Sequence, residues 1–145
     1  WSSDVCSSDL EVGMGLIGTL PSALSFDALL KKVKSDFNCG CIKHSNNELK
    51  QITSVAVLGG SGSFAIDQAK ALGAQVYITA DLKYHDFFKG QKDFALMDIG
   101  HYESEQFTKD LIVDYLSKKF TNFAPSLPTV KVKKSNVKTN PISYY

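Results

Sequence analysis

Three short apolar runs, rich in Val, Ile and Leu, constrain the fold of this chain more than any other feature. They cover residues 52–58, 75–79 and 94–99, and a polar turn and a helix-like pattern follow each of them. Continuous apolar runs of this length, bounded by turn residues, are typical of buried parallel strands. The segments between them fit right-handed crossovers. The sequence therefore predicts an α/β fold with a mainly parallel sheet and helices on both faces.

Composition narrows the class of protein. The 145 residues are 43% hydrophobic and 21% charged, which fits one soluble domain with a sizeable core. No apolar run approaches the roughly 18 residues of a membrane span, so we expect no membrane partner. The net charge of +1 gives no case for nucleic acid. Every basic residue is Lys, so any anion site has to use Lys, backbone N–H groups or a metal. We interpret Cys39 and Cys41 as free thiols in a reducing cytoplasm.

Residues 1–10 differ from the rest of the chain. They show no hydrophobic period, and they read as the translation of a DNA sequence that resembles a common sequencing-library adapter. We interpret residues 1–10 as an adapter-derived scar that is not native, and we take residues 11–145 as the domain. On this interpretation the true upstream coding sequence is missing. The alternative is a native terminus without regular structure.

Several element boundaries follow from local signals. We expect an irregular strand over residues 11–20 that ends at Pro21, and a helix over 26–37 with Ser25 as its N-cap. We expect the last long helix over 101–120. Its predicted buried face consists of Phe107, Leu111, Ile112, Tyr115 and Leu116.

The segment Gly100-His101-Tyr102-Glu103-Ser104-Glu105 is the strongest chemical signal. His101 and Glu105 are four residues apart at a helix start, which places an imidazole and a carboxylate one turn apart on one face. Both are ligands for divalent metals. Glu103 should project to another side of the helix. The alternative is a helix N-terminus that carries acids because the macrodipole favours them there.

A second polar cluster, 81–86, follows the preceding predicted strand. Asp81 ends that strand and His101 follows the next, so neighbouring parallel strands should place both at one rim of the sheet. Asp81 and His85 are candidate acid/base groups or groups that support a metal ligand. The alternative is that Asp81 caps a helix and His85 is solvated. His44 is interpreted as an ordinary residue of a polar loop.

The glycines after residue 58 offer a different reading. Gly60 and Gly62 follow a strand and precede a helix, and Asp81 ends the next strand. This matches in outline the dinucleotide fingerprint of Rossmann-type domains, with the acid placed for a ribose hydroxyl. The glycines equally suit a tight strand-to-helix turn with no ligand.

Five ordered segments together resemble the C-terminal half of the Nif-three-like family, whose members are often called GTP cyclohydrolase I type 2 homologues. The resemblance covers residues 11–145. Its one visible departure is Ala80, where the family usually has Gly before Asp81. The segments are Gly13-Met14-Gly15-Leu16-Ile17-Gly18-Thr19-Leu20, Val55-Ala56-Val57-Leu58-Gly59-Gly60-Ser61-Gly62, Tyr77-Ile78-Thr79-Ala80-Asp81-Leu82-Lys83-Tyr84-His85, Gly100-His101-Tyr102-Glu103-Ser104-Glu105 and Asn140-Pro141.

The resemblance implies one half of a two-half fold in a cytoplasmic protein that assembles into a homo-oligomeric ring, commonly a hexamer. It implies a dinuclear site for two divalent ions (zinc, manganese or iron), with His101 and Glu105 as ligands. The remaining ligands, a His-His pair and an Asp, would come from the N-terminal half.

The expected function is that of a C-terminal fragment of a metal-dependent hydrolase acting on an unidentified small molecule. The fragment alone should bind metal weakly, should not catalyse, and should expose apolar surface. Two alternatives remain open: a non-catalytic metal scaffold or metal chaperone, and a Rossmann-type nucleotide-binding domain that uses Gly60, Gly62 and Asp81.

Overall fold

The computed structural model describes residues 3–5, 13–123 and 132–145. The chain divides into two compact units, Trp1–Ser104 and Glu105–Tyr145, and each is described by itself. The elements of the first unit are β1 (Ser3–Val5), β2 (Leu16–Leu24), α1 (Phe26–Asp36), β3 (Lys43–His44), β4 (Ile52–Ser61), the 3-10 helix η1 (Ser63–Ala65), α2 (Ile66–Ala71), β5 (Val76–Ala80), the 3-10 helix η2 (Tyr84–Lys89) and β6 (Ala95–Asp98). Helix α3 (His101–Glu105) ends at the first residue of the second unit, which also holds α4 (Thr108–Phe123).

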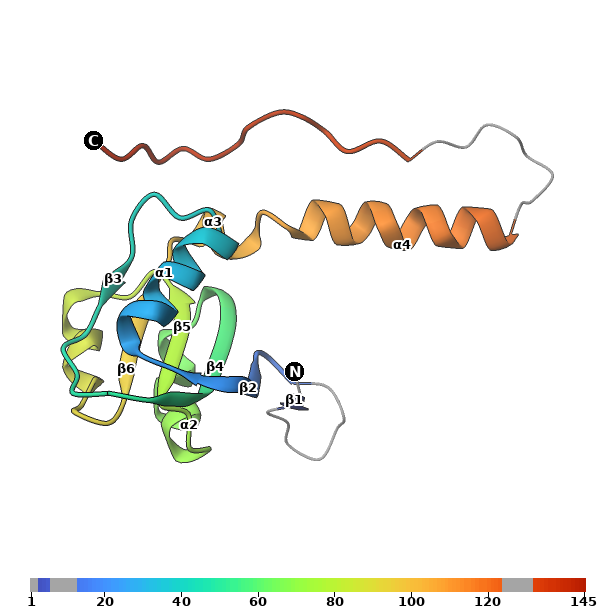
Figure 1. Ribbon diagram of the computed structural model, residues 1–145. Helices are drawn as coiled ribbons and strands as arrows, with labels where there is room; N and C mark the ends of the chain where they lie inside the picture. The colour runs from blue at the N-terminus through green and yellow to red at the C-terminus, as the bar shows by residue number, and fades with distance from the viewer. Residues whose placement is uncertain (1–2, 6–12, 124–131) are drawn as a thin grey trace. The chain divides into compact units, whose positions relative to one another are not determined.

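The sheet has a parallel centre with antiparallel strands on both sides (Figure 1). Its strand order is β1-β2-β4-β5-β6-β3. The three predicted apolar runs form β4, β5 and β6, which pair in parallel. Strand β2 is antiparallel to β4, and β3 is antiparallel to β6. The α/β class and the parallel core are therefore confirmed, and the antiparallel edge strands frame that core.

Helices cover both faces of this sheet, as predicted. On one face α1 packs Leu29 and Val33 onto alternate strand residues such as Val55 and Ile78. On the other face α2 packs Ile66 and Ala69 against Tyr77 and its neighbours. Side chains alternate between the two faces along each strand, so one apolar strand serves two cores.

Helix α1 shows how closely local signals predict an element. Its N-cap is Ser25, whose hydroxyl accepts a hydrogen bond from the backbone N–H of Ala28 at 3.2 Å. Lys34 lies in the last turn and Asp27 in the first, as the helix dipole favours. The predicted cap is confirmed.

Two predicted boundaries are wrong. Pro21 lies inside β2, where the pairing with β4 shifts register between Thr19 and Leu24. Proline has no N–H for a ladder bond, so it interrupts the pairing without ending the strand. The helix predicted over 101–120 is broken, because α3 ends at Glu105 and α4 starts at Thr108.

The predicted burial of the helix after residue 106 is also wrong for this chain. Leu111, Ile112, Tyr115 and Phe107 are exposed. Helical spacing shows that apolar groups share a face, but it cannot show what covers that face. None of the helices in the described ranges combines the length and apolar character needed to cross a membrane.

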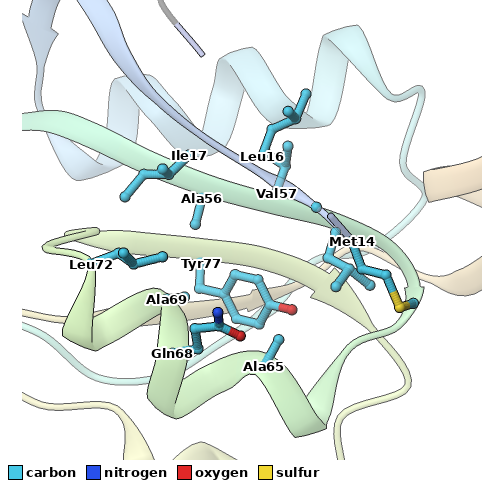
Figure 2. Close-up of a pocket in the computed structure, with 12 residues that line it drawn as sticks. Met14, Leu16, Ile17, Ala56, Val57, Ala65, Gln68, Ala69, Leu72 and Tyr77 are labelled. Carbon is cyan, nitrogen blue, oxygen red and sulfur yellow. The ribbon is translucent and has the colours of Figure 1, made fainter. Parts of the chain in front are cut away.

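A small apolar cavity lies between β2, β4 and α2, and Figure 2 shows its walls. Its volume is about 20 Å³, and Met14, Ile17, Leu72 and Tyr77 are among the residues that line it. A space of this size holds at most one water, and apolar walls offer a water few partners. The cavity is therefore a packing feature of the core.

Candidate metal centre

Asp81 and His101 meet at the carboxyl end of the parallel strands. Asp81 follows β5 directly, and His101 begins α3 after β6. The Oδ2 atom of Asp81 lies 2.6 Å from Nδ1 of His101. Strands β5 and β6 pair in parallel with Thr79 opposite Asp98, which brings the two loops together. The prediction that both residues lie at one rim is confirmed.

This contact decides the orientation of the imidazole. An ionised carboxylate only accepts hydrogen bonds, so Nδ1 of His101 carries a proton and donates a hydrogen bond to Asp81. In the neutral ring the lone pair is then on Nε2. A carboxylate that fixes the tautomer and orientation of a histidine in this way is the usual support of a metal-ligating histidine. The geometry therefore fits the donor chemistry predicted for His101.

Asp81 adopts an uncommon backbone conformation, with φ of 56°. Left-handed values are rare outside glycine, although Asp tolerates them better than most residues. Unusual backbone geometry concentrates at functional sites, where the surrounding structure holds it in place.

Glu105 is the last residue of α3, four positions after His101. Both residues are exposed, whereas Glu103 between them is only 5% exposed. Glu103 therefore projects to another side of the helix, as predicted. Its charge acts on Cys39, whose pKa rises to about 11, mainly because the thiol is buried and secondly because of Glu103. Ligation by His101 and Glu105 stays a prediction.

Asp98, which no sequence pattern singled out, holds the rim together. Its carboxylate is 2% exposed and lies 2.7 Å from Nζ of Lys43. Oδ2 also accepts the N–H of Leu82 at 3.1 Å, and Oδ1 accepts the N–H of Gly100 at 3.0 Å. Leu82 follows Asp81 and Gly100 precedes His101, so one buried carboxylate fixes both loops. The signal that could have identified Asp98 is that it is the only acid inside the apolar run 94–99.

His85 lies on the 3-10 helix η2. It is exposed, and its ring stacks with Phe88 at 6.2 Å and meets Tyr84 edge-on at 5.3 Å. The interval 84–89 forms a 3-10 helix, whose three residues per turn differ from the α-helical turn that the prediction assumed. A catalytic role for His85 stays a prediction, as does an acid/base role for Asp81.

Gly60 lies inside β4, which runs beyond the predicted end at residue 58, and Gly62 is the N-cap of η1. Gly60 has φ of 69°, and its N–H donates to the Ser104 hydroxyl at 2.8 Å. Thr79 donates its hydroxyl to the carbonyl of Gly60 at 3.1 Å. Tyr77 donates its hydroxyl to the carbonyl of Gly62 at 2.9 Å. A side chain at Gly62 would collide with the Thr79 hydroxyl, so this glycine is required for close packing. These contacts give both glycines a structural role where β4 passes into η1.

Within the described residues, no group of three or more His, Cys, Asp or Glu side chains could hold a metal ion. One imidazole and one carboxylate supply half of the four ligands of a typical zinc site.

Comparisons with known proteins agree with this fold. The model of the Duf34/NIF3 (NGG1p interacting factor 3) family matches residues 3–141. A GTP cyclohydrolase 1 type 2 homolog from Staphylococcus epidermidis is 30% identical over 139 residues, which are 95% of this chain and 37% of the relative. A similar homolog from Nostoc is 35% identical over 108 residues, or 72% of this chain and 41% of the relative.

Solved structures show the same relationship. Staphylococcus aureus protein SA1388 superposes with a TM-score of 0.82 and 26% identity, covering 93% of this chain and 43% of that one. A Bacillus cereus protein related to NIF3 gives a TM-score of 0.79 and 29% identity, with 92% and 36% covered. The chain thus spans less than half of these relatives. The extent of the family match and the shared fold place this chain in the DUF34/NIF3 family.

Proposed function

We propose that, in the complete protein, this chain contributes His101 and Glu105 to a dinuclear site for divalent zinc, manganese or iron, and that the site serves a hydrolase. The observation that carries the proposal is the 2.6 Å contact between Asp81 and His101. It orients the imidazole in the way that supports metal ligation. The similarity to proteins called GTP cyclohydrolase 1 type 2 homologs supports the choice of hydrolysis.

The residues of this chain would act in three ways. Asp81 holds the ring of His101 in its orientation by accepting the Nδ1 hydrogen bond. Asp98 holds the loops of both residues by accepting the N–H groups of Leu82 and Gly100. Glu105 offers a carboxylate one helical turn after His101. When bound, a divalent ion would polarise the substrate and lower the pKa of water.

Metal affinity tests the ligand assignment. In a full-length clone, His101→Ala and Glu105→Ala should each weaken zinc binding by more than the roughly 10–100-fold that loss of a supporting group costs. Glu48→Ala is the matched control, since Glu48 is an exposed acid paired with Lys92. Unchanged affinity in His101→Ala would refute the assignment.

Turnover tests the reaction class. The full-length protein is assayed against a panel of nucleotides and phosphoesters, and hydrolysis should fall with the loss of His101. Two ions per subunit with no hydrolysis across the panel would favour the metal scaffold or chaperone instead. The 145-residue chain alone should lose its metal in a chelator wash, because two ligands leave the ion largely hydrated.

The assembly and location of the complete protein are part of the same proposal. We propose a homo-oligomeric ring, a hexamer, that acts in the cytoplasm on a small-molecule substrate. Light scattering of the full-length protein measures the number of subunits, and a monomer would contradict the ring.

A further inference from the structure

A cleft of about 490 Å³ lies between residues 43–46 and the 3-10 helix η2. All of it belongs to the first unit. Small-molecule sites commonly measure about 300–1,000 Å³ and combine aromatic walls with a few polar groups. The lining of this cleft has that mixed character, with Lys43, His44 and Asn46 among its polar residues and Tyr84, Phe87 and Phe88 as its aromatic ones.

Two rings of the aromatic wall are largely exposed to solvent. Tyr84 is 74% exposed and Phe88 is 70% exposed. Their rings meet edge-on with centroids 5.3 Å apart, which holds each ring in place. Exposed apolar rings that border a cleft are costly in water, and a planar ligand would cover them by stacking.

The polar wall presents a defined hydrogen-bonding edge. Nδ1 of His44 lies 3.1 Å from the carbonyl oxygen of Ser45, so Nδ1 carries the proton when the ring is neutral and Nε2 is an acceptor. Phe26 meets the same ring edge-on at 5.2 Å. Lys43 directs one N–H toward Asp98, and an ammonium has three such donors. The wall therefore combines an acceptor with a cation.

The two walls join at a rigid floor. A Cβ atom at Gly90, the residue after η2, would collide with the side chain of Ser45. The backbone of Ser45 donates to Leu96 at 3.0 Å, and its hydroxyl accepts the N–H of Leu96 at 2.9 Å. The floor is thus fixed to β6, and a site formed before binding loses little freedom when a ligand enters.

We propose that this cleft binds a small planar aromatic anion. Its ring would stack on Tyr84 and Phe88, its anionic group would accept a hydrogen bond from Lys43, and His44 Nε2 would accept one from a polar edge. The proposal goes beyond the metal site and does not depend on it, because no cleft residue is a proposed metal ligand.

The test compares two anions that differ mainly in ring planarity. The chain, with chelator present, is titrated with 2-naphthoate and with the saturated decahydro-2-naphthoate, and backbone amide shifts are followed by NMR. We expect 2-naphthoate to bind more tightly and to shift residues 43–46 and 84–90. Equal affinity for both compounds, or shifts scattered over the surface, would overturn the proposal.

Single substitutions in the cleft test which side chains contribute to the binding of 2-naphthoate. Phe88→Leu should weaken 2-naphthoate binding about two- to tenfold, the value of a ring–ring contact beyond its area. His44→Gln keeps a polar group at position 44. The affinity of this variant for 2-naphthoate provides a second measurement if Phe88→Leu disturbs folding. Phe64→Leu is the matched control, because Phe64 is 65% exposed and does not line the cleft. Equal losses in Phe64→Leu and Phe88→Leu would count against the cleft.

A second copy of the chain is the competing occupant. If the amide shifts of residues 84–90 change on dilution and 2-naphthoate does not compete with that change, the rings form a protein interface and the proposal fails. Because the titration contains chelator, its outcome is separate from that of the metal-affinity experiment.

Discussion

The carboxylate of Asp81 and the imidazole of His101 are twenty residues apart in the sequence and 2.6 Å apart in the structure. Two adjacent parallel strands deliver them to one rim, and the buried carboxylate of Asp98 fixes the loops that carry them. The pair belongs to the segments that make the chain resemble its family, and its geometry supports the proposed metal ligation.

Asp81→Asn should weaken divalent-metal binding by the complete protein about 10–100-fold, because the substitution removes the charge that supports His101. Competition with a fluorescent chelator measures this change. Asp67→Asn is the control, since Asp67 is an exposed acid paired with Lys89. Equal affinity in wild type and Asp81→Asn would show that the contact has no role in metal binding.

Asp98→Asn should lower the free energy of unfolding by about 2–4 kcal/mol, because an amide cannot accept at both of its positions and the Lys43 pair is lost. One N–H of Leu82 or Gly100 would then face an NH₂ group. Urea unfolding followed by circular dichroism measures the loss. The exposed pair of Glu48 and Lys92 provides the comparison, since Glu48→Gln should leave the midpoint nearly unchanged.

Gly62→Ala should destabilise the chain by about 1–3 kcal/mol, because the added methyl collides with the hydroxyl of Thr79 and approaches that of Tyr77. Gly73→Ala separates the effect of packing from that of backbone strain. Gly73 has φ of 82° but open space around it, so its cost is strain alone, about 1 kcal/mol. Thermal unfolding of both variants tests whether Gly62→Ala lowers stability more than Gly73→Ala does. A smaller loss of stability in Gly62→Ala would contradict the prediction.

The buried thiol of Cys39 should make stability fall as the pH rises from about 9. Burial raises the pKa of Cys39 to about 11, above its ordinary value of 9.0, with Glu103 as the second cause. The unfolded chain therefore loses this proton first, and the loss of stability is complete above pH 11. Urea midpoints of wild type and Cys39→Ala, measured from pH 8 to 11, should differ in slope. Parallel curves would show that the thiol does not contribute.

The local parts of the fold could be predicted from particular residues. Val and Ile runs predicted β4, β5 and β6, and Ser25 predicted the start of α1, because each signal acts over a few neighbouring residues. Pro21 was misread because β2 continues through the interval where its pairing with β4 shifts register. The long helix was wrong because a helical spacing continues across the break after Glu105.

In the candidate site too, some features could be predicted from local sequence and others could not. The spacing of His101 and Glu105 and the place of Asp81 at a strand end could be predicted from the sequence, since helical period and parallel pairing fix them. The roles of Asp98 and Ser104 could not, because their partners Lys43, Leu82 and Gly60 are far away in the chain.

The sequence by itself determined the alternation of strands and helices, the parallel core, and the placement of Asp81 and His101 at its rim, because apolar period and turn chemistry are local properties. Only the tertiary structure decided which carboxylate orients His101, which one is buried beneath the rim, and how Ser45 and Gly90 close a cleft beside η2. These contacts join residues that only folding brings within hydrogen-bonding or van der Waals distance, so no local pattern encodes them.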